Sequence, residues 1–341
     1  MNNPEDNKRG SGGHRGGGGG ARRGGNGRRP QQQQQGRPQP NHRPNPTAAP
    51  AAAPVAAAVT PPAPKKPSIT TQKLTLTAWD MARTRNEQPD SPRGQLMTLR
   101  SHQRLLSSFE HERAIPDPDR SFLKVGEKTN GSVLLIHGVS TGPGDLRELA
   151  NYLADNKYNV YVLRLPDYGT TGNTISEISW ESSLFQARQC FELLNRGGGK
   201  VHVVGMGFGA TLAVHLARKD RLSSLILLAP AIIPTASRMQ RFLVRFRLHH
   251  FGAIRRYVGW NADLMEGMDK ARAHVGKLKI PVYAAQCDDD DRASPESLRF
   301  LQRKAKHKGS RFQVFPSGGH AILAAHGKQR LYSEIVKFCD G

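Results

Sequence analysis

The sequence contains few cysteines and no long apolar run. Its three cysteines, Cys190, Cys287 and Cys339, are widely spaced and odd in number, which argues against a disulfide framework and suits a reducing compartment. No apolar run approaches the roughly 18 residues that a membrane span needs. The N-terminus also lacks the apolar core of a secretory signal, because glycine and glutamine follow its charges. We therefore expect a cytoplasmic protein.

Residues 1–67 have scarcely a large apolar side chain and no aromatic residue. They cannot bury enough surface to offset the entropy of ordering, so we predict a disordered tail, Gly/Arg/Gln-rich at first and then Ala/Pro-rich. The tail carries +9 of the chain's net charge of +22. It is expected either to bind RNA, DNA or another polyanion without sequence preference, or only to solubilise the chain. The candidate phosphate-binding residues are Arg15, Arg22, Arg23, Arg28 and Arg29.

The rest of the chain has the pattern of an α/β protein. Residues 68–118 are predicted to form a helical lead-in that packs loosely on the main domain, with an apolar stripe that includes Leu99 and Leu106. From Gly131 onward, short apolar runs alternate with helical periodicity, which predicts a parallel sheet with helices on both faces. The expected strands are 133–136, 159–163, 201–204, 225–228, 282–285 and 312–315.

One insertion, at about residues 232–277, interrupts this alternation. Met239, Phe242 and Phe246 lie along one stripe of an expected helix, with arginines three and four residues apart beside them. We favour a helical cap over the carboxyl ends of the strands, because ligands of α/β domains bind there. The alternative is a basic amphipathic helix that lies on a membrane.

The segment from Val201 to Ala217 is a strand, a glycine-rich turn and a helix. This is the geometry of a G-x-S-x-G nucleophile elbow, but the position of the nucleophile is Gly207, which has no side chain. Gly205, Gly207 and Ala210 also match the dinucleotide fingerprint G-x-G-x-x-A. Against that template, two strands precede this one, and the next strand ends without the acidic residue that would bind the ribose.

The run VLLIHGVSTGPGDLRELANYLADNKYNVYVLRLPDYGTTG closely resembles the opening of the α/β-hydrolase fold, and above all its carboxylesterase and monoacylglycerol-lipase branch. The resemblance covers about residues 119–341. It implies a remnant triad of Asp290 and His320, with Asp289 or Asp291 as other registers for the acid. It also implies an oxyanion hole formed by the backbone N–H groups of Val139 and Phe208.

Substitutes for the missing nucleophile are few. Ser140 is expected to be a turn residue, Cys287 a small buried hydrophobe and His326 a surface residue. The run of four acids from Asp288 to Asp291 would attract a cation, but consecutive acids on one loop rarely converge on a metal. No cofactor and no metal are expected.

Two functional hypotheses remain. The protein is either a non-hydrolytic scaffold that holds a small apolar or acyl ligand, or an enzyme in which His320 and Asp290 act as a general base without a protein nucleophile. A residual carboxylic-ester hydrolase activity is a variant of the second hypothesis.

Overall fold

The computed structural model describes residues 92–124, 129–166, 168, 179–196, 199–219, 221–259 and 261–341. The predicted tail, with its five candidate arginines, lies outside the described residues. So does the first part of the predicted lead-in, up to residue 91.

A seven-stranded sheet in the order β1-β3-β2-β4-β5-β6-β7 forms the centre of the fold. Six strands are parallel, and they agree with the predicted strands to within two residues at each end. Strand β1 pairs antiparallel with β3 and was not predicted, because three residues are too few to show a period. The strands are β1 (Phe122–Lys124), β2 (Gly131–Ile136), β3 (Tyr158–Leu163), β4 (Val201–Met206), β5 (Ser224–Leu228), β6 (Val282–Cys287) and β7 (Arg311–Phe315).

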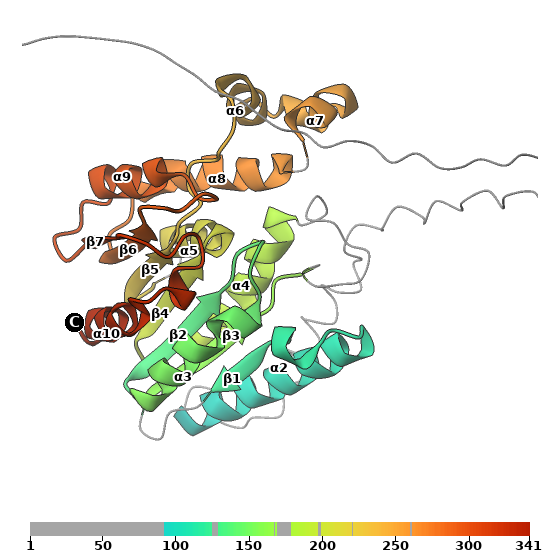
Figure 1. The fold of residues 1–341 in the computed structure, drawn as a ribbon. Coiled ribbons are helices and arrows are strands. Elements are labelled where there is room, and N and C mark those ends of the chain that lie inside the picture. Colours follow the sequence, from blue (N-terminus) through green and yellow to red (C-terminus); the bar gives the residue numbers. More distant parts are fainter. Residues whose placement is uncertain are drawn as a thin grey trace, which may run out of the picture. The chain divides into compact units, whose positions relative to one another are not determined.

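Helices cover both faces of the sheet, as predicted (Figure 1). Successive residues of β2 alternate between the two cores: Leu134 and Ile136 pack on one face, Val133 and Leu135 on the other. On the first face lie α4 (Trp180–Asn195), α5 (Phe208–Lys219), α8 (Ala262–Val275) and α9 (Pro295–Lys304), and on the second α3 (Arg147–Asp155) and α10 (Lys328–Asp340). Short 3-10 turns η1 (Asp117–Asp119), η2 (Pro143–Leu146) and η5 (Ile322–Ala324) connect these elements.

Helix α2 (Pro92–Glu112) precedes the sheet, and it is firmly packed. Leu99 and Leu106 are buried in the same core as α4 and α5. The ring of His102 is within hydrogen-bond distance of the Tyr161 hydroxyl, at 2.9 Å, and Glu110 accepts hydrogen bonds from the backbone and the hydroxyl of Ser121. The expectation of loose packing was therefore wrong, because buried polar bonds as well as apolar contacts hold this helix against β1 and β3.

The insertion at 232–277 is helical, as predicted, but it has two parts. Its second half, α8, belongs to the layer that covers the sheet and packs against α5. Its first half forms what we call the outer unit, residues 237–259, with α6 (Arg238–Arg245), η4 (Leu248–His250) and α7 (Gly252–Val258). Figure 1 shows the outer unit on the far side of α8 from the sheet. Among the described residues, no helix combines the length and apolarity needed to cross a membrane.

Candidate active site

The elbow lies where β4 ends and α5 begins. Gly207 is the single residue between them, with φ of +55°, in the left-handed region. Its N–H donates to the carbonyl of Leu228 at 2.9 Å, and its carbonyl accepts from the N–H of Ala231 at 3.0 Å. The turn is thus fixed by the carboxyl end of the neighbouring strand, β5.

The three glycines of the elbow are present for different reasons. A Cβ on Gly205 would lie 2.3 Å from the carbonyl oxygen of Gly209, and a Cβ on Gly209 would lie 2.2 Å from that of Ile136. Backbone contacts this short exclude any side chain at these two positions. At Gly207 the nearest atom to a Cβ would be Nε2 of His320, at 3.2 Å. A small side chain at position 207 therefore requires the His320 imidazole to shift by a few tenths of an ångström, in addition to the cost of the left-handed backbone.

The structure brings His320 and Asp290 together beside this turn. His320 Nδ1 lies 3.1 and 3.2 Å from the two carboxylate oxygens of Asp290. Asp290 also accepts hydrogen bonds from the backbone N–H groups of Arg292 and Ala293 and from the side-chain amide of Gln286. Burial opposes ionisation of Asp290, but the bonds from His320 and from the backbone outweigh it and lower its pKa. A charged Asp290 makes Nδ1 of His320 the donor, which leaves Nε2 with a lone pair toward position 207.

Asp289 has a separate role that the sequence analysis missed. It accepts hydrogen bonds from the backbone N–H groups of Gly318, at 3.2 Å, and Gly319, at 2.7 Å. Both glycines have positive φ. Asp289 therefore holds the turn that presents His320, while Asp290 binds the imidazole. The pair of glycines directly before a histidine was the available signal for such a turn.

The loop after β2 supplies the other side of the site. The Nε2 atom of His137 accepts from the N–H of Leu165 at 2.9 Å, so its Nδ1–H donates to the carbonyl of Gly138. Burial lowers the pKa of His137 to about 4, which keeps the ring neutral. Gly138 in turn donates to the hydroxyl of Thr141. These bonds shape the turn that carries Val139.

The two predicted oxyanion donors make no hydrogen bond to another described residue. Val139 is half-buried in the turn after Gly138, and Phe208 is the buried first residue of α5. A Cβ on Gly207 would lie 3.6 Å from Cα of Gly138, so the loop of Val139 directly faces the elbow. A loop N–H and a helix-start N–H beside the elbow are the donors that hold a carbonyl oxygen in acyl transfer.

Comparisons with known proteins agree with this geometry. Residues 133–333 match the model of the alpha/beta hydrolase family. The chain belongs to this family. The dinucleotide template is thereby set aside, since the glycines lie in the elbow of a hydrolase sheet.

Individual relatives of this alpha/beta hydrolase are distant. It is similar to lipase LipV of Mycobacterium tuberculosis, with 31% identity over 119 residues, which are 34% of this chain and 44% of the relative. The match thus spans less than half the length of that curated relative. Among solved structures, it is similar to one described with LipS and LipT, two metagenome-derived lipolytic enzymes, with a TM-score of 0.57 and 15% identity over 66% of this chain and 98% of the other. It is also similar to the monoacylglycerol lipase of Paleococcus ferrophilus, with a TM-score of 0.54 and 19% identity over 64% of this chain and 97% of the lipase.

Among the described residues, no hydroxyl or thiol hydrogen-bonds to His320. Cys287 is buried, and burial raises the pKa of its thiol to about 11, so it is protonated at neutral pH. Ser140 and His326 are exposed, the former in the turn after Val139. The run of acids does not converge on one point, because Asp289 faces the glycine turn and Asp290 faces the imidazole.

Among the described residues, one cluster elsewhere has the composition of a metal site. It consists of His249, His250 and Glu266, between the outer unit and α8. One oxygen of Glu266 is 2.6 Å from Lys270 Nζ and 3.5 Å from Arg247 Nε. Two cations already neutralise this carboxylate, so the cluster is better explained as an ion network that joins η4 to α8.

Proposed function

We propose that this alpha/beta hydrolase fold binds a small apolar or acyl ligand beside Gly207 and His320, without forming an acyl intermediate. The observation that carries the proposal is the missing side chain at the elbow. The backbone N–H groups of Val139 and Phe208 are suited to donate hydrogen bonds to a ligand carbonyl oxygen, and they need no side chain at position 207.

Covalent catalysis requires an atom that receives the acyl group. His320 accepts a proton from a hydroxyl, but Gly207 has no hydroxyl to offer. Removal of such a serine lowers turnover by about 10⁶-fold and leaves roughly 10³–10⁴ over water from the oxyanion hole and binding. The remaining groups, His320 and the backbone N–H groups of Val139 and Phe208, therefore support ligand binding and not acyl transfer.

The second candidate is a hydrolase that activates water directly, and the ionised Asp290 beside His320 favours it. In this mechanism Nε2 of His320 takes a proton from a water molecule, and the oxygen attacks the ester carbonyl. The N–H groups of Val139 and Phe208 stabilise the oxyanion. The proton on His320 then passes to the leaving alkoxide, which releases the alcohol and the acid.

Three measurements on the wild-type protein test these candidates. The first proposal expects no covalent labelling by a fluorophosphonate probe, hydrolysis of a nitrophenyl ester barely above background, and a fatty acid or related ligand in native mass spectrometry. A label that maps to Ser140 or any other hydroxyl would contradict it. Ester turnover that disappears in His320→Ala, with no covalent label, would instead support the water mechanism.

We also propose that the basic segment 1–67 binds nucleic acid without sequence preference. Its excess of positive charge supports this through counterion release. The full chain is expected to bind unrelated RNA and DNA weakly, with an affinity that falls steeply with salt. A chain that begins at Ser68 is expected not to bind. Equal binding by both chains would place the contact on the folded domain.

A further inference from the structure

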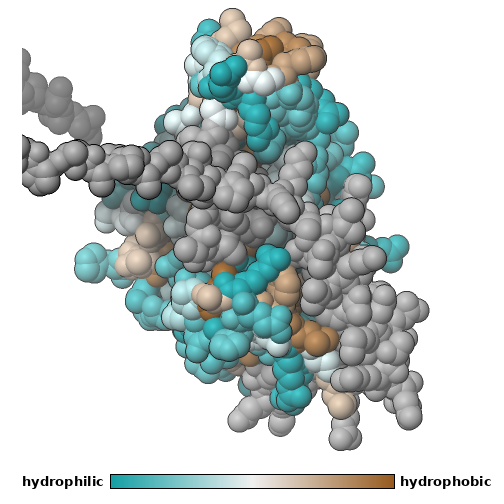
Figure 2. Space-filling model, turned by 90° about the vertical axis from the view of Figure 1, so that its right-hand side faces the viewer, coloured by the Kyte–Doolittle hydropathy of each residue, from teal (hydrophilic) through white to brown (hydrophobic). Residues whose placement is uncertain are grey.

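The outer unit exposes an unusual share of the molecule's large apolar side chains. Five of the seven such side chains found exposed among the described residues belong to it, and each is more than half exposed. The rings of Phe242 and Phe246 lie 4.6 Å apart, one turn of α6 from each other. Figure 2 shows brown residues gathered at the top of the molecule, over the outer unit, with teal residues beside them. The five are Met239, Phe242, Phe246, Phe251 and Tyr257.

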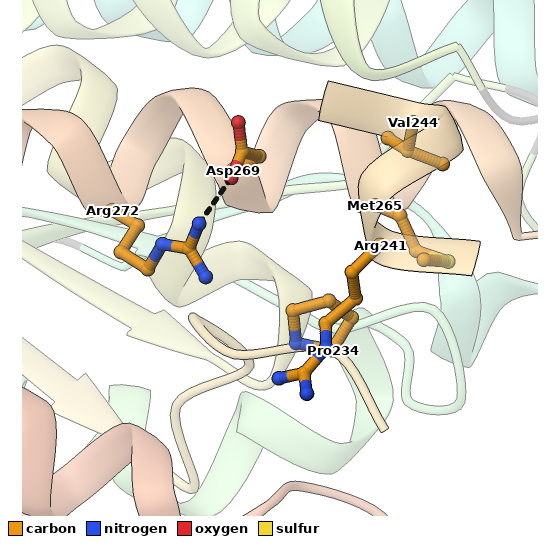
Figure 3. Close-up of a pocket in the computed structure, with 6 residues that line it drawn as sticks. All are labelled: Pro234, Arg241, Val244, Met265, Asp269 and Arg272. Carbon is orange, nitrogen blue, oxygen red and sulfur yellow. Dashed lines mark hydrogen bonds and ion pairs between the residues drawn. The ribbon is translucent and has the colours of Figure 1, made fainter. Parts of the chain in front are cut away.

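Positive charge surrounds this apolar surface. The segment from Ala231 to Gly259 contains six arginines and no acidic residue. Arg238, Arg241 and Arg256 form no ion pair with a described residue, so their charge is available to a partner. Arg241 also lines a small pocket between α6 and α8 (Figure 3), where Asp269 already pairs with Arg272.

These apolar side chains are exposed although the outer unit has a small hydrophobic core on its inner side. In that core, Val244 and Val258 pack with Ala262 and Met265 of α8. The buried Glu266 fixes the unit further, since His249 Nε2 lies 3.0 Å from its carboxylate. The unit is therefore anchored on its inner side, and its outer side presents phenylalanines and arginines together.

We propose that the outer unit docks this protein on the surface of an anionic lipid membrane. Aromatic and apolar side chains enter the boundary between headgroups and acyl chains, and arginines at their edge contact the lipid phosphates. A second copy of the chain fits this surface poorly, because pairing two outer units would bring like charges together. A nucleic acid would contact the arginines but leave Met239 and the phenylalanines without an apolar layer to enter. The proposal is independent of what binds beside His320.

Vesicle binding by the full chain tests the proposal. We expect the protein to co-sediment with vesicles that contain phosphatidylglycerol and not with pure phosphatidylcholine vesicles. Phe242→Ser with Phe246→Ser should lower the affinity at least about tenfold, through lost apolar insertion. Arg238→Gln, Arg241→Gln and Arg256→Gln should each lower it up to about fivefold. Val314→Ser is the matched control, because Val314 is also 59% exposed but lies on β7.

The basic tail remains in all these proteins, so its own attraction to anionic vesicles is common to them. If Phe242→Ser with Phe246→Ser leaves the affinity for the vesicles unchanged, the protein adsorbs through the tail, and the proposal is overturned. Arginine changes that weaken RNA binding, without any effect on vesicles, would assign the surface to nucleic acid instead.

A fluorescent label reports insertion directly. Cys190, Cys287 and Cys339 are all buried, so a cysteine introduced as Phe246→Cys can be labelled selectively with an environment-sensitive nitrobenzoxadiazole dye. On phosphatidylglycerol vesicles its emission should shift to the blue and increase, whereas the dye on Val314→Cys should not change. An unchanged spectrum from position 246 on bound protein would refute insertion of the outer unit.

Discussion

The candidate site has a histidine side and an elbow side, and they differ in completeness. On the histidine side, Asp290 receives hydrogen bonds from His320, from two backbone N–H groups and from Gln286. On the elbow side, the turn lies between β4 and α5, but Gly207 provides no side chain. A small side chain there would come into tight contact only with the His320 imidazole, which is a side chain and not backbone. The comparison shows that the shape of the elbow needs no side chain at position 207, because backbone bonds and the neighbouring glycines form the turn.

The largest expected effect comes from completing the elbow side. Gly207→Ser should raise hydrolysis of an activated nitrophenyl ester by about 10³-fold or more over wild type, because triad residues act as a unit. Gly207→Ala is the matched control, since it adds the Cβ and the strain of positive φ without the hydroxyl. The gain should vanish when His320→Ala is added. A folded but inactive Gly207→Ser would show that the two sides are not aligned for acyl transfer.

Breaking the histidine side should remove most of that gain. In the Gly207→Ser background, Asp290→Asn should return turnover to within about tenfold of the wild-type level, because an amide no longer stabilises the imidazolium. Asp289→Asn should lower turnover less than about tenfold, since its carbonyl oxygen still accepts a bond from the glycine turn. Steady-state kinetics of the two variants check this order, and the reverse order would assign the acid to Asp289.

A side chain at Gly205, which packs against backbone, should destabilise the protein more than a side chain at Gly207. Gly205→Ala should lower the free energy of unfolding by about 3 kcal/mol or more, because its Cβ has only backbone to displace. Gly207→Ala should cost only about 1–2 kcal/mol, for the left-handed backbone. Urea unfolding monitored by circular dichroism measures both values, and equal losses would contradict the distinction between the glycines.

Acid should weaken the elbow side before the histidine side. In the folded state the pKa of His137 is about 4, against roughly 6.5 when unfolded. The unfolded state then binds more protons below pH 6.5, so stability is full above that pH and falls toward pH 4, by up to about 3 kcal/mol. The pKa of Asp290 is also lowered in the folded state, but from a much lower starting value. Its stabilisation persists down to its unfolded pKa of about 3.9 and is lost only as the pH falls further.

Unfolding free energies measured between pH 8 and 3.5 test this order. His102 also has a pKa lowered to about 4 by burial, so it contributes a similar loss from α2. His102→Gln should flatten the slope between pH 6.5 and 4 without removing it, because His137 still titrates. A slope that appears only below pH 4 would mean that the buried histidines do not govern acid stability.

Local patterns in the sequence predicted the parts of the fold that depend on near neighbours. The six parallel strands are short apolar runs buried on both faces, and such runs are visible without any tertiary knowledge. The elbow was predicted for a similar reason, because a strand, glycines at fixed spacing and a helix follow one another within seventeen residues. That the elbow position, Gly207, has no side chain also needed only the sequence.

Tertiary structure alone decided which groups meet across long separations. Asp290 rather than Asp289 faces His320. The partners are separated by thirty residues that include α9 and β7, and a one-residue shift on the loop turns a side chain away. Helix α2 is held by contacts to Tyr161 and Ser121 that no helical period reveals. The insertion divides into two parts because the apolar stripes of its helices are covered differently. Helix α8 packs on the layer that covers the sheet, whereas the outer unit leaves Phe242 and Phe246 exposed. Apolar spacing predicts that a helix has an apolar face, but only packing determines whether that face is covered.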